Sequence, residues 1–121
     1  MGPPALVDTN ILIDLIAGLP LALNVVRRHP NRAISVVTRI EVLVGLREGE
    51  RDRAEMLLSN FQQIELTPEI AEETLQVRRA TRLKLPDAIL LATAQVEKRV
   101  LLTRNTRDFQ AGRFVRFPYS V

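Results

Sequence analysis

Short apolar runs alternate along the chain with longer stretches of mixed polarity. The runs are three to five residues long and are either continuously apolar or alternating, as short β-strands are. They cover residues 5–7, 33–37, 63–66, 100–103 and 114–117. The stretches between them have the pattern of helices, with Thr67 and Pro68 as a typical helix start. These predicted helices cover residues 10–16, 21–28, 38–47, 51–60, 67–83 and 86–98.

Strands that alternate with helices form right-handed β-α-β units around a parallel sheet. We therefore predict an α/β protein, a three-layer α/β/α sandwich with a parallel sheet of four or five strands. At 121 residues, without internal repeats, the chain is expected to form one domain. Residues 1–4 (Met-Gly-Pro-Pro) are expected to be disordered or vector-derived.

Composition narrows the classes of protein that the chain can represent. Apolar residues make up 46% and charged residues 26%, which excludes an intrinsically disordered chain. The absence of cysteine excludes disulfides, thiolate metal sites and cysteine nucleophiles. No apolar run approaches the roughly 18 residues that span a bilayer, and no signal peptide opens the chain. We therefore expect a cytoplasmic protein without membrane contacts.

The charge of the chain comes mostly from arginine. Fifteen of the 17 basic residues are Arg, and the net charge is +3. Guanidinium groups suit bidentate phosphate contacts, so this composition is compatible with a nucleic-acid partner. It is equally compatible with a coding sequence rich in G and C. With four Phe, one Tyr and no Trp, binding by aromatic stacking platforms is disfavoured.

Acidic residues follow the predicted strands at informative places. Asp8 ends the first strand, and Glu41 lies one turn into the helix after the second. Asp87 lies in the first turn of a helix, and Asp108 follows the last interior strand. Open α/β sheets place their ligands at the carboxyl ends of strands. If these carboxylates share one pocket, they raise each other's pKa unless a cation intervenes, and oxygen ligands suit Mg²⁺ or Mn²⁺.

Each acid also has a purely structural interpretation. Asp8 can be a helix N-cap, and Asp87 can favour the helix dipole. Thr38 and Glu41 fit the capping box S/T-x-x-E, in which Glu41 only reaches back to the Thr38 amide. Asp14 is expected to be a solvated helix residue. Spacing along the chain does not decide between a shared metal site and these local roles.

Four segments of the chain resemble, in order, the sequence blocks of PIN-domain ribonucleases. The resemblance extends from residue 5 to about residue 117, and the sequences of the four segments are most similar to those of VapC-type toxins of toxin–antitoxin pairs. Any one block is weak support, whereas four blocks in sequence are strong support. The blocks are residues 7–14 (VDTNILID), 35–46 (SVVTRIEVLVGL), 85–94 (LPDAILLATA) and 101–109 (LLTRNTRDF).

The resemblance implies a metal-dependent endoribonuclease with an acidic triad of Asp8, Glu41 and Asp87 that holds Mg²⁺ or Mn²⁺. Many relatives carry a fourth acid where this chain has Asn105. Asp108, three residues later, either compensates as a fourth catalytic carboxylate or caps the next turn. The amide at position 105 also supports an alternative, a PIN-like scaffold that binds RNA or protein without cutting.

Further roles follow from the same resemblance and from position. Asn10, Thr103 and Asn105 are expected to support the acidic residues or to position water. Arg39 is close in sequence to Glu41, and Arg104 and Arg107 bracket Asn105, so these three arginines are the candidate RNA contacts.

A second set of arginines and two apolar helices are open to two interpretations each. Arg78, Arg79 and Arg82 either extend the phosphate track or form a solvated helix face, and we favour the solvated face. The helices that carry Glu41 and Asp87 have apolar residues on more than one face, so they are buried on two sides or leave a partner surface. The resemblance implies a homodimer and a cognate VapB-type antitoxin that lays a helix on an apolar groove.

Two other kinds of chemistry fit the residues less well. Asp8 could be the nucleophile of a phosphotransfer enzyme, but a D-x-D phosphatase needs an acid where this chain has Asn10. A receiver domain needs a lysine after a late strand, and neither Lys84 nor Lys98 has that place. His29 is the single histidine and is expected at the surface, so a metal-free mechanism with imidazole acid and base is disfavoured.

Overall fold

A single parallel sheet runs through the middle of the molecule. The computed structural model describes residues 1–121, and its strands are β1 (Ala5–Val7), β2 (Arg32–Ser35), β3 (Gln62–Ile64), β4 (Val100–Leu102) and β5 (Val115–Arg116). Their order in the sheet is β3-β2-β1-β4-β5, and every neighbouring pair is parallel.

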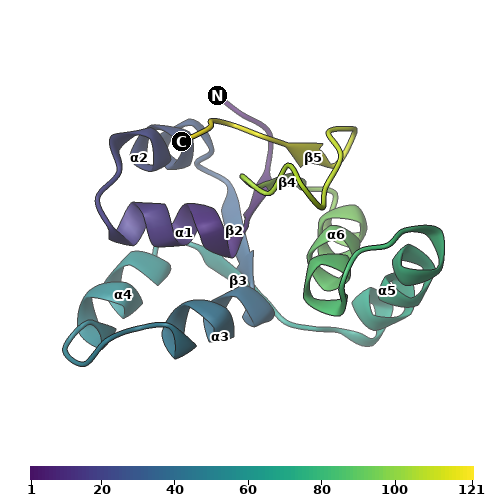
Figure 1. The fold of residues 1–121 in the computed structure, drawn as a ribbon, viewed down its shortest axis with the longest axis horizontal. Coiled ribbons are helices and arrows are strands. Elements are labelled where there is room, and N and C mark those ends of the chain that lie inside the picture. The colour runs from purple at the N-terminus through teal and green to yellow at the C-terminus, as the bar shows by residue number, and fades with distance from the viewer.

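Helices cover both faces of this sheet, which confirms the predicted three-layer sandwich (Figure 1). Four helices pack on one face and two on the other. The first group is α1 (Thr9–Ile16), α2 (Pro20–Arg28), α3 (Val36–Val44) and α4 (Arg51–Leu58). The second group is α5 (Pro68–Ala80) and α6 (Leu85–Glu97). No single helix is both long and apolar enough to cross a membrane; α1 and α2 pass such a test only as a pair bent by 120°.

Alternation along the central strands builds two separate cores. Ala5 and Val7 of β1 point into the core under α1 to α4, whereas Leu6 between them points into the core under α5 and α6. On β4, Leu102 belongs to the first core and Leu101 to the second. These strands are buried on both sides, so they are continuously apolar, as strands of covered parallel sheets are.

The helix start after the second strand differs from the prediction. β2 ends at Ser35, and Ser35 Oγ caps α3 by accepting a hydrogen bond from Val37 N at 3.1 Å. Thr38 is therefore inside the helix and fully buried, and its hydroxyl has no hydrogen-bond partner. The capping-box interpretation of Glu41 is wrong, because the cap lies three residues earlier than Thr38.

Three further expectations about local structure are corrected. Helix α5 ends at Ala80 because Thr81 has extended backbone, so Arg82 lies beyond the helix that we predicted to reach residue 83. Residues 2–4 are ordered against the body of the protein: Gly2 N donates to Arg28 O at 2.6 Å. His29 is buried rather than at the surface, with its ring Nδ1 2.8 Å from Pro3 O.

The order in which strands are added to the sheet reverses at its centre. From β1 the chain builds outward through β2 to β3, whereas β4 and β5 extend the other edge. In open α/β sheets, such a switch point leaves a crevice beyond the carboxyl ends of the two strands, here β1 and β4. Asp8 and Thr103 are the residues that directly follow these two strands.

Candidate active site

Asp8 is held in one orientation at the switch point. Thr103 Oγ1 donates to Asp8 Oδ2 at 2.7 Å, and Asn10 Nδ2 donates to the same oxygen at 3.3 Å. The other carboxylate oxygen, Oδ1, accepts from Thr9 N at 2.7 Å, so Asp8 is also the N-cap of α1. Asp8 and Thr103 are both buried. The local N-cap role and a place in a shared site therefore coexist in Asp8.

Asn10 and Thr103 connect Asp8 to the loop after β4. Asn10 Nδ2 donates to Thr103 Oγ1 at 3.2 Å, and Asn10 Oδ1 accepts from Arg104 N at 3.2 Å. Thr103 Oγ1 also accepts from Asn105 N at 3.0 Å. The predicted supporting residues thus form one hydrogen-bonded network that fixes the loop relative to Asp8.

Glu41 reaches this network from helix α3. Its Oε1 accepts a hydrogen bond of 2.7 Å from Thr9 Oγ1, the residue next to Asp8. Burial raises the pKa of Asp8, hydrogen bonds from Thr103 and Thr9 lower it, and the charge of Glu41 raises it, with a net upward shift. The two acids are therefore close enough to repel each other, although Glu41 itself is exposed.

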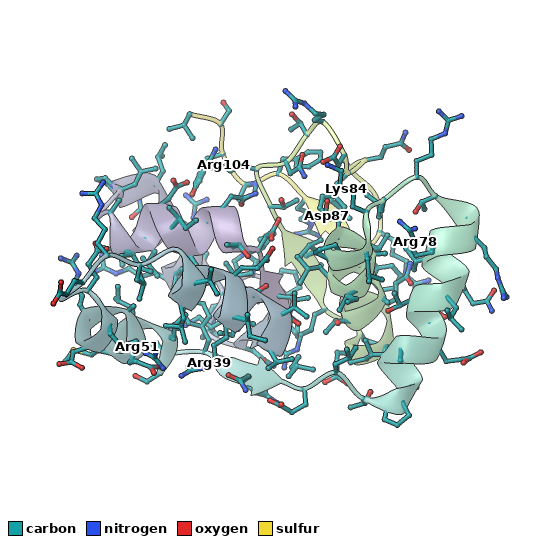
Figure 2. All side chains as sticks on the ribbon, turned by 60° about the horizontal axis from the view of Figure 1, so that its bottom comes forward. Arg39, Arg51, Arg78, Lys84, Asp87 and Arg104 are labelled. Carbon is teal, nitrogen blue, oxygen red and sulfur yellow. The ribbon has the colours of Figure 1, made fainter.

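Asp87 lies in the first turn of α6 without a hydrogen bond from any protein group. Its pKa is raised to about 6, first by burial and then by the charges of Asp8, Asp108 and Glu41, while Lys84 lowers it. Figure 2 shows Asp87 and Lys84 on the same side of the molecule. Four acidic residues from four separate segments therefore share one region of negative potential.

None of these four carboxylates is in an ion pair, since the only acids paired with arginine are Glu55 and Asp14. Repulsion among unpaired carboxylates costs free energy in the absence of a cation. The side chains are not arranged so that three of them could hold one ion together. The region thus has the donor chemistry of a metal site, without a preformed cage.

Asn105 and Asp108 act as a pair in the loop after β4. Asn105 Oδ1 accepts from Asp108 N, and Asn105 Nδ2 donates to Asp108 Oδ2, both at 3.1 Å. Asn105 therefore caps the turn, which is the role that we left open for Asp108. The Asp108 carboxylate is exposed and contributes to the potential at Asp87.

The structure places two of the three candidate RNA-binding arginines in ion pairs. Arg39 Nη2 lies 2.6 and 2.8 Å from the two carboxylate oxygens of Glu55 on α4. In Figure 2, Arg39 lies near Arg51 and away from Asp87. Arg39 is thus turned away from the acidic region, despite its closeness to Glu41 in sequence. Arg107 is exposed and has no ion pair.

Arg104 belongs to a cluster that sequence reasoning missed. Its Nε and Nη2 donate to the two carboxylate oxygens of Asp14 at 2.6 and 3.2 Å. Tyr119 OH donates to Asp14 Oδ2 at 2.6 Å, and burial, followed by this hydrogen bond, raises the pKa of the phenol. Asp14 is therefore not the solvated residue we expected. The separation of 90 to 105 positions gives no local signal for this cluster.

Comparison with known proteins places this geometry in a family. Residues 5–114 match the PIN domain. The chain belongs to the PIN-domain family. Within this family it is 32% identical to Ribonuclease VapC10 of Mycobacterium tuberculosis, over 96% of this chain and 93% of that protein.

Solved structures of toxin–antitoxin proteins agree with the fold. A toxin–antitoxin complex from Klebsiella pneumoniae contains a chain that is 44% identical, with a TM-score of 0.91, over 97% of this chain and 99% of that chain. A DNA-bound VapBC from Salmonella typhimurium has a TM-score of 0.82 at 20% identity, over 95% and 96% of the two chains, and supports the fold alone. The predicted resemblance is thus confirmed, and the phosphotransfer alternatives gain no support.

Proposed function

We propose that this PIN-domain protein is a metal-dependent endoribonuclease, which hydrolyses RNA phosphodiester bonds as the toxin of a type II toxin–antitoxin pair. The observation that carries the proposal is the placement of Asp8 at the switch point, with Glu41 linked to the neighbouring Thr9 by a hydrogen bond and with Asp87 close enough for the charges of Asp8, Asp108 and Glu41 to raise its pKa. The similarity to Ribonuclease VapC10 supplies the reaction class. Because the substrate is RNA, we also place the protein in the cytoplasm.

The donor set fits Mg²⁺ or Mn²⁺. These ions prefer oxygen ligands and bind through a few carboxylates while they keep several waters. Asp8, Glu41 and Asp87 would hold the ion, and the partial exposure of the last two leaves them room to turn toward it. A bound ion would lower the pKa of a water and offset negative charge on the scissile phosphate.

The protein residues would prepare this chemistry. Thr103, Asn10 and Thr9 N fix the Asp8 carboxylate, so one ligand is preorganised and buried. Thr9 Oγ1 orients Glu41. Asp87 releases its proton near pH 6 in the metal-free protein, and a neighbouring cation would drive this release to lower pH.

Cleavage mapping of total RNA tests the proposal. Wild-type protein is expected to produce defined fragments with Mg²⁺ or Mn²⁺ and none with EDTA, and Asp8→Asn is expected to be inactive under both conditions. Binding of RNA without any metal-dependent cleavage would instead support the alternative of a non-cutting PIN-like module, which the amide at Asn105 favours.

An apolar groove next to Glu41 is the proposed binding site of the antitoxin. It is lined by Ile13 and Ile16 of α1, by Val42 of α3 and by Leu46, which follows α3. Ile13 is 53% exposed. A partner helix can place apolar anchors in such a groove, and an arginine from it would pair with the nearby carboxylates. The resolved complex of the 44% identical chain supports a cognate VapB-type antitoxin as this partner.

The two helices that carry Glu41 and Asp87 differ in how they are covered. Helix α6, which carries Asp87, packs between the sheet and α5, and Leu85 at its start is its one large apolar side chain that is more than half exposed. The exposed apolar side chains of α3 are Ile40 and Val44, at 56% and 80%. They favour this helix as part of the proposed homodimer or antitoxin contact.

The antitoxin and the metal would compete for the same site. Because an arginine of the antitoxin and the metal ion would bind the same carboxylates, the affinity for the antitoxin should fall as the Mn²⁺ concentration rises.

A further inference from the structure

Asp108 also lines a second pocket. It has a volume of about 470 Å³, within the range of roughly 300–1,000 Å³ typical of small-molecule sites. Its walls are the turn between α5 and α6 and the loop after β4. Leu83, Leu91, Phe109 and Val115 supply the apolar part of the lining, and Thr81 and Gln110 supply uncharged polar groups.

Hydrogen bonds hold the wall formed by the turn between α5 and α6. Arg78 is exposed, and its Nη1 donates to Leu83 O at 2.7 Å, so this arginine braces the turn from the surface. Thr81 Oγ1 donates to Val77 O at 2.8 Å and accepts from Leu83 N at 3.2 Å. The turn therefore has a fixed shape without any ligand.

The facing wall is held in a similar way. Phe109 N donates to Asn105 O at 3.2 Å, and the Asn105 side chain pairs with Asp108 at both its amide and its carbonyl. The Phe109 side chain is only 3% exposed, so it anchors the loop in the core under α5 and α6. Both walls are thus preorganised, which lowers the entropy that a ligand loses on binding.

Two unpaired arginines stand at this pocket. Arg82 and Arg107 line it, both are exposed, and neither makes an ion pair or a side-chain hydrogen bond. Arg82 lies beyond the end of α5, so it does not belong to the solvated helix face that we expected. Asp108 lines the same pocket and also acts on Asp87, so the pocket adjoins the acidic region.

We propose that this pocket binds one unstacked nucleotide of single-stranded RNA next to the scissile phosphate, with Arg82 and Arg107 on the adjoining phosphates. The proposal rests on the proposed nuclease function and adds a site for substrate recognition. An apolar floor with polar groups at its edge suits a base that has left its stack, and proteins read RNA sequence mainly from such bases. Free guanidinium groups supply the phosphate contacts.

Binding without cleavage tests the arginines. A fluorescein-labelled single-stranded RNA is titrated in EDTA with wild-type protein, Arg82→Gln, Arg107→Gln and the control Arg53→Gln, which removes an exposed, unpaired charge from α4. Each pocket variant should weaken binding about fivefold and reduce the salt slope by about 0.7, the value for one phosphate contact on a single strand. The control should change affinity less than twofold.

Gln110→Ala separates base recognition from phosphate binding. It should alter the base preferred at one position of the cleaved RNAs while leaving the salt slope unchanged. An unchanged preference, or arginine variants that behave like Arg53→Gln, would overturn the pocket assignment, as would wild-type protein that binds no RNA. Pocket variants that lose affinity for an acidic peptide but not for RNA would overturn it in favour of a protein ligand.

These outcomes are distinguishable from failure of the nuclease proposal. If wild-type protein cleaves RNA but the pocket variants match the control, the pocket assignment fails and the nuclease function stands. If the pocket variants bind RNA more weakly but no protein cleaves RNA with Mg²⁺ or Mn²⁺, the RNA site stands and the nuclease proposal fails.

Discussion

Thr103 Oγ1 lies 2.7 Å from Asp8 Oδ2, although the two residues are 95 positions apart in the chain. The sheet register explains the contact: Val7 of β1 pairs with Leu102 of β4, so the residues that follow them emerge side by side. Burial raises the pKa of the Asp8 carboxyl group, and the hydrogen bond from the Thr103 hydroxyl partly offsets this rise. Thr103 is therefore a positioning residue for the first proposed metal ligand.

Thr103→Val removes this hydroxyl while keeping the shape of the side chain. We expect metal affinity and RNA cleavage to fall about 10- to 100-fold, the usual effect of losing a partner of a metal ligand. The free energy of unfolding should fall by about 1–2 kcal/mol, because a buried carboxylate loses a hydrogen bond. Thr103→Ser keeps the hydroxyl and should retain most activity; equal losses in Val and Ser variants would contradict this role.

The raised pKa of Asp87 predicts how metal-free stability depends on pH. The pKa of Asp87 is about 6 in the folded protein against an ordinary value of 3.8, so the folded state binds more protons between these values. Stability from this group is therefore complete below about pH 4 and is lost as pH rises through 6. Asp87→Asn should raise the free energy of unfolding in EDTA at pH 7.5 by on the order of 1 kcal/mol, once solvent screening is allowed for.

Denaturant unfolding at pH 5 and pH 7.5 measures this effect. The gain from Asp87→Asn should be larger at pH 7.5 than at pH 5. Asp52→Asn, at an exposed position of α4, should show no such difference. Asp8→Asn should give little gain, because Asp8 accepts three hydrogen bonds that an amide cannot all accept. A gain that is the same at both pH values would contradict the raised pKa of Asp87.

Glu41→Gln separates charge from local structure. Glu41 is exposed and makes one side-chain hydrogen bond, to Thr9, which glutamine can keep. We expect a change in stability below about 1 kcal/mol, the scale of a single hydrogen bond, with a large loss of metal-dependent cleavage. Thermal unfolding in EDTA and cleavage with Mn²⁺ provide the two readings. Retained activity with lost stability would assign Glu41 a purely structural role.

Asn105→Asp tests the fourth position of the acidic group. A carboxylate here can still accept from Asp108 N, but it loses the amide that donates to the Asp108 carboxylate. We expect metal-free stability to fall by about 0.5–1 kcal/mol from like-charge repulsion. The Mn²⁺ concentration for half-maximal cleavage should fall several-fold, since the site gains an oxygen ligand. An unchanged Mn²⁺ requirement would mean that position 105 lies outside the metal's reach.

Much of this architecture is predictable from local pattern. The three-layer sandwich, the five strands, and the caps at Asp8 and Thr67 follow from apolar runs and helix-start residues. The boundary at Ser35 does not, because Val36 and Val37 are β-branched yet start a helix that Ser35 caps. Intrinsic strand propensity is weak enough for a cap and tertiary packing to override it.

Contacts between distant residues set the limit of sequence reasoning at the site. The positions of Asp8 and Asp87 are predictable because Asp8 follows a strand and Asp87 lies in the first turn of a helix. A parallel sheet brings the carboxyl ends of its strands to one edge. Position in the sequence does not predict where an arginine side chain points. Arg39 pairs with Glu55 and Arg104 pairs with Asp14, and neither pair is evident from the local sequence. His29 was expected at the surface, because nothing in its local sequence indicates that the N-terminal segment covers it.

Metal-dependent cleavage by Asp87→Asn tests the central claim most directly. Asp87 makes no hydrogen bond to the protein, so this substitution removes a charge with little effect on the fold, which circular dichroism can verify. With Mn²⁺ and a single-stranded RNA substrate, the account predicts cleavage by wild-type protein and a loss of at least about 100-fold in the variant. Full cleavage by a folded Asp87→Asn protein, or wild-type cleavage that continues in EDTA, would contradict it.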